Sequence, residues 1–520
     1  MSLDPRLPLD ADTDTELVTW PADDRPRSRL GTALLLLLAL AASVWYFGWL
    51  LQPSRVGNVG LFALLVAAEL FNLCQAAGFW WTASRDGRRR SPLQPLPDIV
   101  DVDVLVPVYG EPVQVVEPTI AAATRMQGAR VHVALLDDGD DPHMRAVAQR
   151  HGARYITRTH HTGAKAGNIN HALRLTRSPL VVVLDCDHVP RADFLMKTLG
   201  EFRDQRVAYV QTPQCYANQG SGGVPAAAWA QQALFFGPIA RGKDALGAMF
   251  CAGTNVVFRR NALDGVGGFP ERSLTEDFQL SIRLHERGWR SVYVPEVLAL
   301  GLGPEDMASY VSQQLRWSRG CLGALPSVLR ARLPLRLRLQ YLLSSMYFLS
   351  GWTVLIYMSL PVVRIFTGMQ PLASASADLF LIHFAPYFVI ALGAVARCGR
   401  GAYTFGGFAL AASTWWVHVL SSLRALLRRS GRFVVTPKQA GSTWQPSVVW
   451  PSLLVAAALA SAASFALVSS RSPSSLNNAA FAVVHMVLQL TGASYALRPR
   501  RRSGRIVSTA VEGVPARATA

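Results

Sequence analysis

The sequence predicts an α/β domain inserted between two groups of membrane-spanning helices. Half of the 520 residues are hydrophobic and only 16% are charged, which is too apolar for a soluble protein of this length. Long apolar runs lie near the N-terminus and again after residue 338, and the stretch between them mixes charged residues with short apolar segments. A spanning helix needs about 20 apolar residues, so the two flanks meet this requirement and the middle does not.

The first membrane group covers residues 30–84 and contains two predicted helices, 30–51 and 58–81. Both runs end on aromatic residues, which favour the membrane interface, and Glu69 is the one charged residue within them. Several acidic residues precede the first run, unlike the basic start of a secretory signal, so we expect this run to be retained as an anchor. Residues 1–29 are expected to be disordered.

The second membrane group covers residues 336–500, and its predicted spans are 339–367, 376–398, 446–469 and 477–497. The remaining apolar run, 403–427, contains Trp415, Trp416, His418 and Arg424. Such a mixture is typical of an amphipathic helix lying at the membrane interface. We therefore predict about six spanning helices, two before the α/β domain and four after it. The basic tail 501–520 is expected to be disordered.

Arginines beside the helix ends predict the orientation in the membrane. The positive-inside rule places the α/β domain and both chain ends in the cytoplasm of a multi-pass plasma (inner) membrane protein, because of Arg25, Arg27, Arg29, Arg85, Arg88 to Arg90, Arg498 and Arg500 to Arg502. The net charge of +17 therefore indicates contact with anionic membrane lipids and not with nucleic acid. The six cysteines never form C-x-x-C, so neither a zinc site nor a disulfide framework is predicted.

Residues 85–335 form the predicted α/β domain. Apolar β-rich runs such as VDVLVPVY, VHVALLDDG and VVVLDCDH alternate with helical patterns, which indicates βαβ units and a mostly parallel sheet covered on both faces. Ligands bind beyond the carboxyl ends of the strands in such sheets. The polar residues predicted at these strand ends are Tyr109, Glu111, Asp137, Asp138, Asp185 and Asp187.

Asp185 and Asp187 form a D-x-D pattern at the end of an apolar strand and are followed by His188. The pattern alone is weak, since it also occurs at residues 12–14 and 101–103, where we assign it no chemistry. At a strand end, two carboxylates need a counter-charge, and hard oxygen ligands suit Mg²⁺ or Mn²⁺, which also bridge to phosphates. The site therefore indicates a nucleotide diphosphate leaving group. Walker-type phosphate binding is not indicated, because G-x-x-x-x-G-K-[ST] is absent.

Three further clusters lie downstream, and each has a structural alternative. Glu276 and Asp277 precede a helical pattern, where two acids could simply stabilise a helix N-terminus. QQLRW, residues 313–317, opens an amphipathic stretch that could be an interfacial helix with basic and aromatic anchors. FVVTPK, residues 433–438, would by itself pass for an ordinary loop.

Together these motifs resemble the processive family 2 glycosyltransferases, the group of cellulose and hyaluronan synthases, and within it the catalytic subunit of bacterial cellulose synthase. The likeness lies in the order Asp137-Asp138-Gly139, Asp185-Cys186-Asp187, Thr275-Glu276-Asp277 and Gln313 to Trp317, together with VPVYGEP, GAKAGNIN, VQTPQ and FCAGTN. The resemblance implies a GT-A (Rossmann-like) cytoplasmic domain beneath a transmembrane channel. It also implies an enzyme that polymerises a UDP-sugar, with UDP-glucose and β-1,4-glucan as the expected donor and product.

The same resemblance implies a role for each motif. Asp277 would be the general base, supported by Glu276, and Trp317 would stack under the terminal sugar of the acceptor. The metal would be Mg²⁺ or Mn²⁺, held by Asp185 and Asp187. The loop 431–440 would close over the nucleotide through Phe433, Thr436 and Lys438. Donor-binding residues would be Tyr109, Glu111, Asp137 or Asp138, Lys165, Asp185, Gln313 and Arg316.

Two departures from the family and three alternatives accompany this interpretation. The chain ends soon after RPRRRSGR, too soon for the PilZ domain that commonly follows, so regulation without one is expected. Gly110 replaces the usual Asn of Y-N-E-P.

The partners expected are the UDP-sugar, the growing glycan and lipids, and accessory glycan-export proteins can join them. The alternatives are a non-processive transferase acting on a lipid or short acceptor, a synthase of a hyaluronan-, chitin- or mannan-like glycan, and a transporter or scaffold with a decayed transferase domain.

Overall fold

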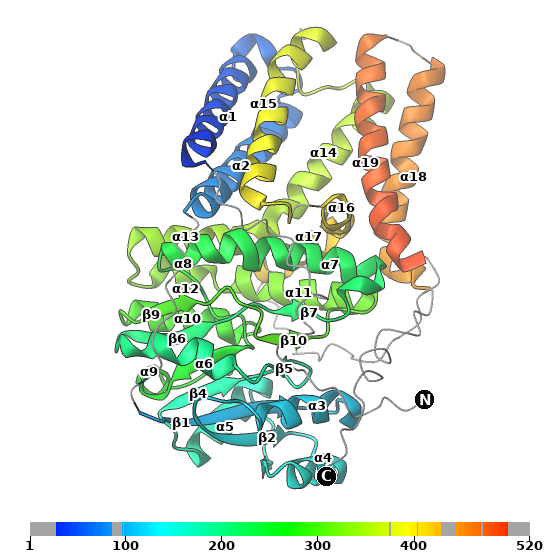
Figure 1. Cartoon of the computed structure of the whole chain (residues 1–520). Helices are drawn as coiled ribbons and strands as arrows, with labels where there is room; N and C mark the ends of the chain where they lie inside the picture. Colours follow the sequence, from blue (N-terminus) through cyan, green and yellow to red (C-terminus); the bar gives the residue numbers. More distant parts are fainter. Residues whose placement is uncertain are drawn as a thin grey trace, which may run out of the picture.

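The computed structural model describes residues 28–85, 96, 98–373, 376–402, 404–427, 444–469 and 472–497. A bundle of long helices stands on an α/β part, and several helices lie across the junction between the two (Figure 1). The predicted tails and the predicted gating loop 431–440 lie outside the described residues.

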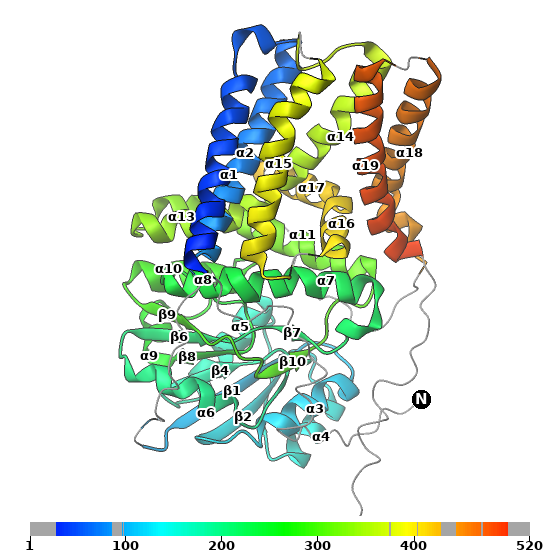
Figure 2. The same ribbon diagram turned by 45° about the horizontal axis from the view of Figure 1, so that its top comes forward.

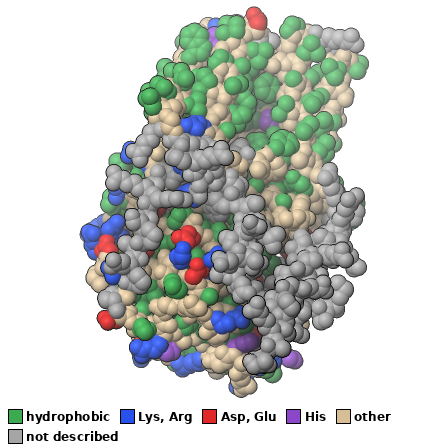
Figure 3. Space-filling view, in the orientation of Figure 1, with side chains coloured by type: hydrophobic (Ala, Val, Ile, Leu, Met, Phe, Trp, Pro, Cys, Tyr) green, Lys and Arg blue, Asp and Glu red, His purple; other side chains and the backbone are tan. Residues whose placement is uncertain are grey.

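Six helical segments are long and apolar enough to cross a membrane, two before the α/β part and four after it, as the sequence predicts. Large hydrophobic side chains are exposed along them, and Figure 3 shows charged side chains mainly on the lower, α/β half of the molecule. The long helices of these segments are α1 (Arg29–Leu50), α2 (Val59–Ala83), α14 (Ser350–Thr367), α15 (Ala377–Gly399), α18 (Pro446–Ser469) and α19 (Pro473–Leu497).

The run 403–427 was predicted as one interfacial helix, and the structure divides it into two helices. It forms two short helices, α16 (Phe405–Ser413) and α17 (Trp415–Leu426), which meet at Thr414. The carbonyl groups freed at the break are satisfied from the bundle, because Gln489 of α19 donates to the Ala412 carbonyl (3.0 Å) and Ser452 of α18 donates to the Ser413 carbonyl. Neither helix is long enough to span a membrane.

The α/β part is built on a seven-stranded sheet with the order β3-β2-β1-β4-β8-β6-β9. β8 runs antiparallel to both of its neighbours, and the other described neighbours pair in parallel. β1 pairs with β2 along its whole length, so Val108 lies opposite Asp137 and the two strands end together. The strands are β1 (Asp101–Val108), β2 (Arg130–Asp137), β3 (Arg154–Ile156), β4 (Leu180–Val183), β6 (Val207–Gln211), β8 (Val256–Arg259) and β9 (Arg290–Tyr293).

Helices cover both faces of this sheet, because side chains along each strand alternate between the faces. Val104 and Val106 pack into the core beneath α3 (Val113–Ala123), α4 (Pro142–Arg150) and α6 (Phe194–Thr198). Leu105 packs into the opposite core, beneath α5 (Ala164–Leu175), α9 (Arg260–Gly265) and α10 (Glu276–Glu286). Each such buried side chain contributes about 1.5–3 kcal/mol, so the continuous apolar strands stabilise this part.

The junction consists of a small second sheet and a layer of helices (Figure 2). The sheet has the order β5-β10-β7, from Val189–Pro190, Ala299–Gly301 and Cys215–Tyr216. α8 packs backbone to backbone against the end of α2, since a Cβ at Gly242 would overlap the carbonyl oxygen of Thr82. The helices are α7 (Gly223–Leu234), α8 (Ala240–Ala245), α11 (Met307–Gly323), α12 (Leu325–Arg330) and α13 (Leu335–Met346), which reaches α14 through the 3₁₀ turn Tyr347–Leu349.

Candidate active site

Asp185 and Asp187 follow β4, the strand next to β1, as the sequence predicts. The backbone N–H of Asp185 donates to the Thr254 hydroxyl (2.7 Å), which fixes this turn to the segment before β8. The carboxylate of Asp187 is fully buried and lies 3.2 Å from Nδ1 of His188. Cys186 between the two acids is buried in the apolar core below them.

These residues have the donor atoms for a divalent cation. Asp185, Asp187 and His188 each offer a ligand atom, and the three atoms lie within 4.8 Å of one another. The Nε2 atom of His188 is buried and has no partner among the described residues. A Cβ at Gly301 would overlap the His188 ring, so a glycine there leaves the space that the ring occupies. The two carboxylates suit Mn²⁺ or Mg²⁺, whereas an imidazole is not a ligand that Mg²⁺ prefers.

Lys165, at the start of α5, reaches Asp185. Its ammonium donates to Asp185 Oδ1 (2.5 Å) and to the Gly253 carbonyl (2.8 Å). Burial alone would lower the pKa of Lys165, but the carboxylates of Asp185 and Glu276 raise it above its usual range. Lys165 is therefore a fixed positive charge between two groups of carboxylates.

Asp277 lies in the first turn of α10, as the sequence predicts. The backbone N–H of Phe278 donates to Asp277 Oδ1 (2.7 Å), and Gly253 lies so close that a Cβ there would be 2.8 Å from Oδ2. Burial and then the neighbouring Glu276 carboxylate raise the pKa of Asp277 to about 7, against the opposing charges of Lys165 and others. A carboxyl group that titrates near neutral pH is suited to act as a general base.

Gln313, Arg316 and Trp317 occur at helical spacing in α11 and therefore share one face of it. The Gln313 side chain is hydrogen-bonded to Tyr216, which also lies near the Asp187 and Arg316 charges. Arg316 is close enough to Asp277 to oppose the rise of its pKa. The fold thus gathers residues from the turn after β4 and from α5, α10 and α11 into one site, and α11 belongs to the helix layer between the α/β part and the bundle (Figure 1).

The acids after β2 have internal partners. Asp137 accepts hydrogen bonds from the backbone N–H groups of Gly139 and Asp141 (2.7 Å each) and from the Tyr155 hydroxyl (2.8 Å). Asp138 is paired with Arg158, whose Nε donates to Oδ1 and whose Nη2 donates to Oδ2, each at a distance of 2.6 Å. Both carboxylates therefore have fixed orientations at the end of β2, and their contact with a nucleobase stays a prediction.

Tyr109 and Glu111 lie just after β1, whose last residue, Val108, is paired with Asp137. The backbone N–H of Tyr109 donates to Glu111 Oε2 (2.6 Å), and Gly110 between them has a φ of 76°, which favours glycine. The Tyr109 ring is 58% exposed, so it is free to meet a ligand from solvent.

The Arg158–Asp138 pair gives a stability prediction. Both side chains are buried, with 6% and 7% of their surfaces exposed. Arg158→Met would leave the Asp138 charge unpaired in the interior, which costs about 3–5 kcal/mol, so we expect a marked drop in the thermal unfolding midpoint. The matched control is Arg206→Met, which removes a surface partner of Asp204 and should cost less than about 1 kcal/mol. Equal effects of the two variants would contradict a structural role for Arg158.

Several residues of the site gave no signal in the sequence. Arg158, Tyr155 and Tyr216 lie in short loops or strands where no periodic pattern singles out one side chain. Gly253 and Thr254 belong to FCAGTN, which the resemblance includes without giving it a role. Phe433, Thr436 and Lys438 of the predicted gating loop lie outside the described residues.

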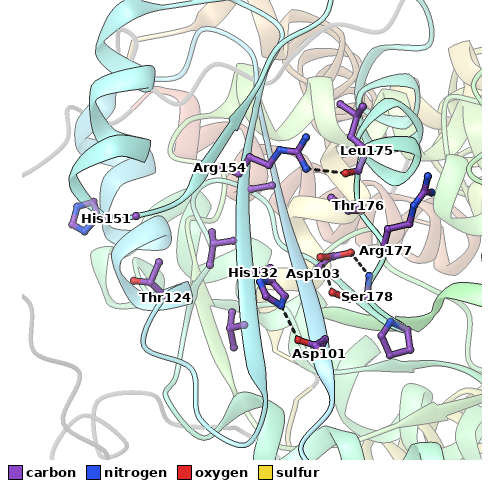
Figure 4. A pocket seen from close by; sticks show the side chains of 15 residues that line it. Asp101, Asp103, Thr124, His132, His151, Arg154, Leu175, Thr176, Arg177 and Ser178 are labelled. Atoms are coloured by element: carbon purple, nitrogen blue, oxygen red, sulfur yellow. Dashed lines mark hydrogen bonds and ion pairs between the residues drawn. The ribbon is translucent and has the colours of Figure 1, made fainter.

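A cavity of about 670 Å³ lies at the opposite edge of the sheet, near the amino ends of β1 and β2 (Figure 4). Its carboxylates already have partners, because Asp101 bonds His132 (2.9 Å) and Asp103 accepts from the backbone and hydroxyl of Ser178 (2.9 and 2.8 Å). Asp103 is also paired with Arg260 (2.6 Å). The D-x-D pattern at residues 101–103 is therefore held by hydrogen bonds and ion pairs within the chain.

Comparison with known families finds matches over the part of the chain that contains these site residues. Residues 97–320 match the family model described as glycosyltransferase-like family 2, and residues 268–399 match the model described as cellulose synthase. Cellulose synthase 2 of Novacetimonas hansenii is 33% identical over 456 residues, which are 82% of this chain and 28% of that protein. The UDP-forming cellulose synthase catalytic subunit of Xanthomonas axonopodis pv. citri is 33% identical over 62% of this chain and 47% of that protein. The chain thus spans less than half the length of these two relatives.

A solved structure with a similar fold is the mannosyltransferase of Pyrobaculum calidifontis in complex with GDP-Man and Mn²⁺. It aligns with a TM-score of 0.52 and 17% identity, covering 71% of this chain and 99% of that one. At this identity the likeness concerns the fold alone. Together with the mixed seven-stranded sheet, it confirms the GT-A fold expected for the α/β part.

Proposed function

The chain belongs to the family 2 glycosyltransferases, with a cellulose synthase-like region at residues 268–399, and on this premise we propose that it polymerises a UDP-sugar and moves the product across the membrane. Glucose is the proposed sugar and a β-1,4-glucan the proposed product. The observation that carries the proposal is the arrangement of Asp185, Asp187 and Lys165 beside Glu276, Asp277 and Arg316.

The proposed reaction is a single displacement at the anomeric carbon of the donor sugar. Asp277 takes the proton from the acceptor hydroxyl, which becomes the nucleophile, and Glu276 supports it from the adjacent position. Lys165 and Arg316 supply positive charge on the side where the UDP diphosphate departs. Trp317 is half-buried, and in this proposal its ring is the platform for the acceptor sugar.

Asp185, Asp187 and His188 would hold the divalent cation, Mg²⁺ or Mn²⁺, in this proposal. The cation supplies charge that neutralises the diphosphate leaving group. The positions of the three residues fit this use, because they lie at the carboxyl end of β4, where nucleotides bind in open α/β sheets.

The pKa of Asp277 predicts how activity depends on pH. A base must be unprotonated, and burial with the Glu276 charge raises the pKa of Asp277 to about 7. The rate constant kcat should therefore fall about tenfold per pH unit below 7 and level off above it. A pH series of UDP release at saturating donor measures this; an acidic limb near pH 4 would assign the rate to a different group.

The decisive experiment is a panel of radiolabelled UDP-sugars offered to membrane vesicles that contain the protein. We expect incorporation from UDP-glucose into a long polymer that a β-1,4-specific glucanase digests. Short or lipid-linked products would favour the non-processive alternative, and incorporation from UDP-N-acetylglucosamine would favour another glycan. No UDP release from any donor would contradict the proposal itself.

We also propose that the catalytic part faces the cytoplasm of the inner membrane. The arginines that flank the predicted spans support this orientation. A reporter fused at the C-terminus should be active only inside the cell, and activity outside would contradict it.

A further inference from the structure

Lys243 in α8 is a lysine buried at the junction between the α/β part and the helix bundle. Only 3% of the residue is exposed, and its ammonium donates to the carbonyl oxygen (3.1 Å) and the side-chain oxygen (2.9 Å) of Gln340. Within the described chain these neutral atoms are its hydrogen-bond acceptors. Lysine is almost never fully buried without a carboxylate, because the charge loses its hydration. Burial lowers the pKa of Lys243 to about 7.

Gln340 connects this lysine to a membrane helix. Its amide nitrogen donates to the Thr82 hydroxyl (2.7 Å), one residue before the last residue of α2. Gln340 itself is buried and lies in α13, which leads into α14. The close approach of Gly242 to Thr82 brings α8 to the same point. Lys243, Gln340 and Thr82 therefore form one polar joint between α2, α8 and α13.

A row of aromatic rings leads from this joint to the first turn of α10. Lys243 lies over the Phe250 ring (5.5 Å), and Phe250 meets Phe278 edge to face (4.9 Å between centroids). Tyr341, next to Gln340, also meets Phe278 edge to face (5.2 Å between centroids). Phe278 directly follows Asp277 and bonds its carboxylate through the backbone. The placement of Phe278 therefore fixes the direction of the Asp277 carboxylate.

The segment 250–253, which follows α8, is bonded to the same turn. The backbone N–H of Cys251 donates to the Ser281 hydroxyl (2.8 Å), which in turn donates to the Asp277 carbonyl (2.8 Å). Gly253 at the end of the segment has a φ of 84° and contacts the Asp277 carboxylate. A shift of α8 would therefore reach Asp277 from this side as well.

Tyr341 holds the far end of α10 through a second contact. Its hydroxyl lies 2.7 Å from Nδ1 of His285, and Nε2 of His285 lies 3.0 Å from the Ser291 hydroxyl at β9. All three side chains are buried. α13 thus contacts α10 at both its first turn and its last.

We propose that Lys243, Gln340 and Tyr341 are positioning residues that set the orientation of Asp277 according to how α2 and α13 sit at the membrane. None of the three touches the site directly; they act through Phe250, Phe278 and the segment 250–253. This inference rests on the proposed function of Asp277 as the base. It gives a reason for keeping an unpaired buried lysine, which stability alone disfavours.

The test uses full-length protein in lipid nanodiscs with Lys243→Met, which keeps the side-chain length over Phe250 and removes the ammonium. We expect kcat to fall about 10- to 100-fold, as expected for a small misplacement of a reacting group, while KM for the donor stays within about twofold. The acidic limb of the pH profile should move to lower pH, because water reaching Asp277 relieves the burial that raises its pKa. Ala245→Ser, at an exposed position of the same helix, is the control and should match the wild type.

Tyr341→Phe tests the inference if Lys243→Met does not fold, since it keeps the ring beside Phe278 and removes only the hydroxyl, which is bonded to His285 and Ser281. It should lower kcat by about threefold to tenfold without changing KM. Backbone hydrogen exchange in 276–281 should quicken in both variants. An unchanged kcat and unchanged exchange would overturn the inference, and so would a fall in kcat with an unshifted pH profile. A wild-type protein that transfers no sugar would overturn the proposed function instead, and the exchange rates would still test the joint.

Discussion

Replacing Asp277 by asparagine is expected to reduce sugar transfer by about 10²–10⁴-fold, the usual contribution of a general base, while UDP still binds. The amide keeps the size of the side chain and can still accept from the backbone N–H of Phe278, so the first turn of α10 should hold its shape. It cannot accept the proton of the acceptor hydroxyl. Release of UDP measures the transfer, and calorimetry with UDP measures the binding.

The same variant should be more stable than the wild type at alkaline pH. The pKa of Asp277 is raised by burial from its usual value to about 7, so its contribution to stability is present at low pH and is lost as pH rises through 7. Each unit of pKa shift corresponds to about 1.4 kcal/mol. Asp277→Asn should therefore raise the unfolding midpoint at pH 8, and the difference should shrink toward pH 4.

The control for both measurements is Asp264→Asn, at an exposed position of α9. It removes one carboxylate from the same domain and should change neither transfer nor stability by a measurable amount. If Asp277→Asn kept more than about a tenth of the activity, a different group would be the base. If it also weakened UDP binding, its main role would be in holding the donor.

The spans and the strand-end site could be predicted from the sequence because each depends on a local pattern. A spanning helix requires only length and apolarity, and α18 follows the predicted limits 446–469 residue for residue. Asp185 and Asp187 could be placed because an apolar strand ends just before them. That Asp185 and Asp187 share a site with Asp277 could be expected only from the family resemblance. The two acids precede Asp277 by about ninety residues, and no local sequence pattern connects them with it.

The remaining features depend on contacts between distant segments. The break at Thr414 is satisfied by Ser452 and Gln489, residues whose relation to it is invisible before folding. Likewise, Arg158 meets Asp138, and Lys243 meets Gln340, through pairings that neither periodicity nor composition encodes. In loops, and in helices without a clear apolar face, the sequence pattern does not indicate which polar residue will be buried.

Replacing Asp187 by alanine is expected to remove the dependence of UDP binding on Mn²⁺ or Mg²⁺. The Asp187 carboxylate is fully buried beside His188, so it faces the site from a fixed position, whereas Asp185 is held by Lys165. Loss of a residue that merely orients a metal ligand costs about 10- to 100-fold in metal affinity, and loss of a ligand should cost at least as much.

The measurement is calorimetry of UDP with and without the cation, on the wild type and the variant. The wild type should bind UDP more tightly with the cation, and Asp187→Ala should bind it equally weakly in both conditions. Asp264→Asn again serves as the control, because it lowers the negative charge by the same amount away from the site. Since His188 keeps its place against Gly301, a variant that still showed tighter binding with the cation would assign the metal to Asp185 and His188 alone.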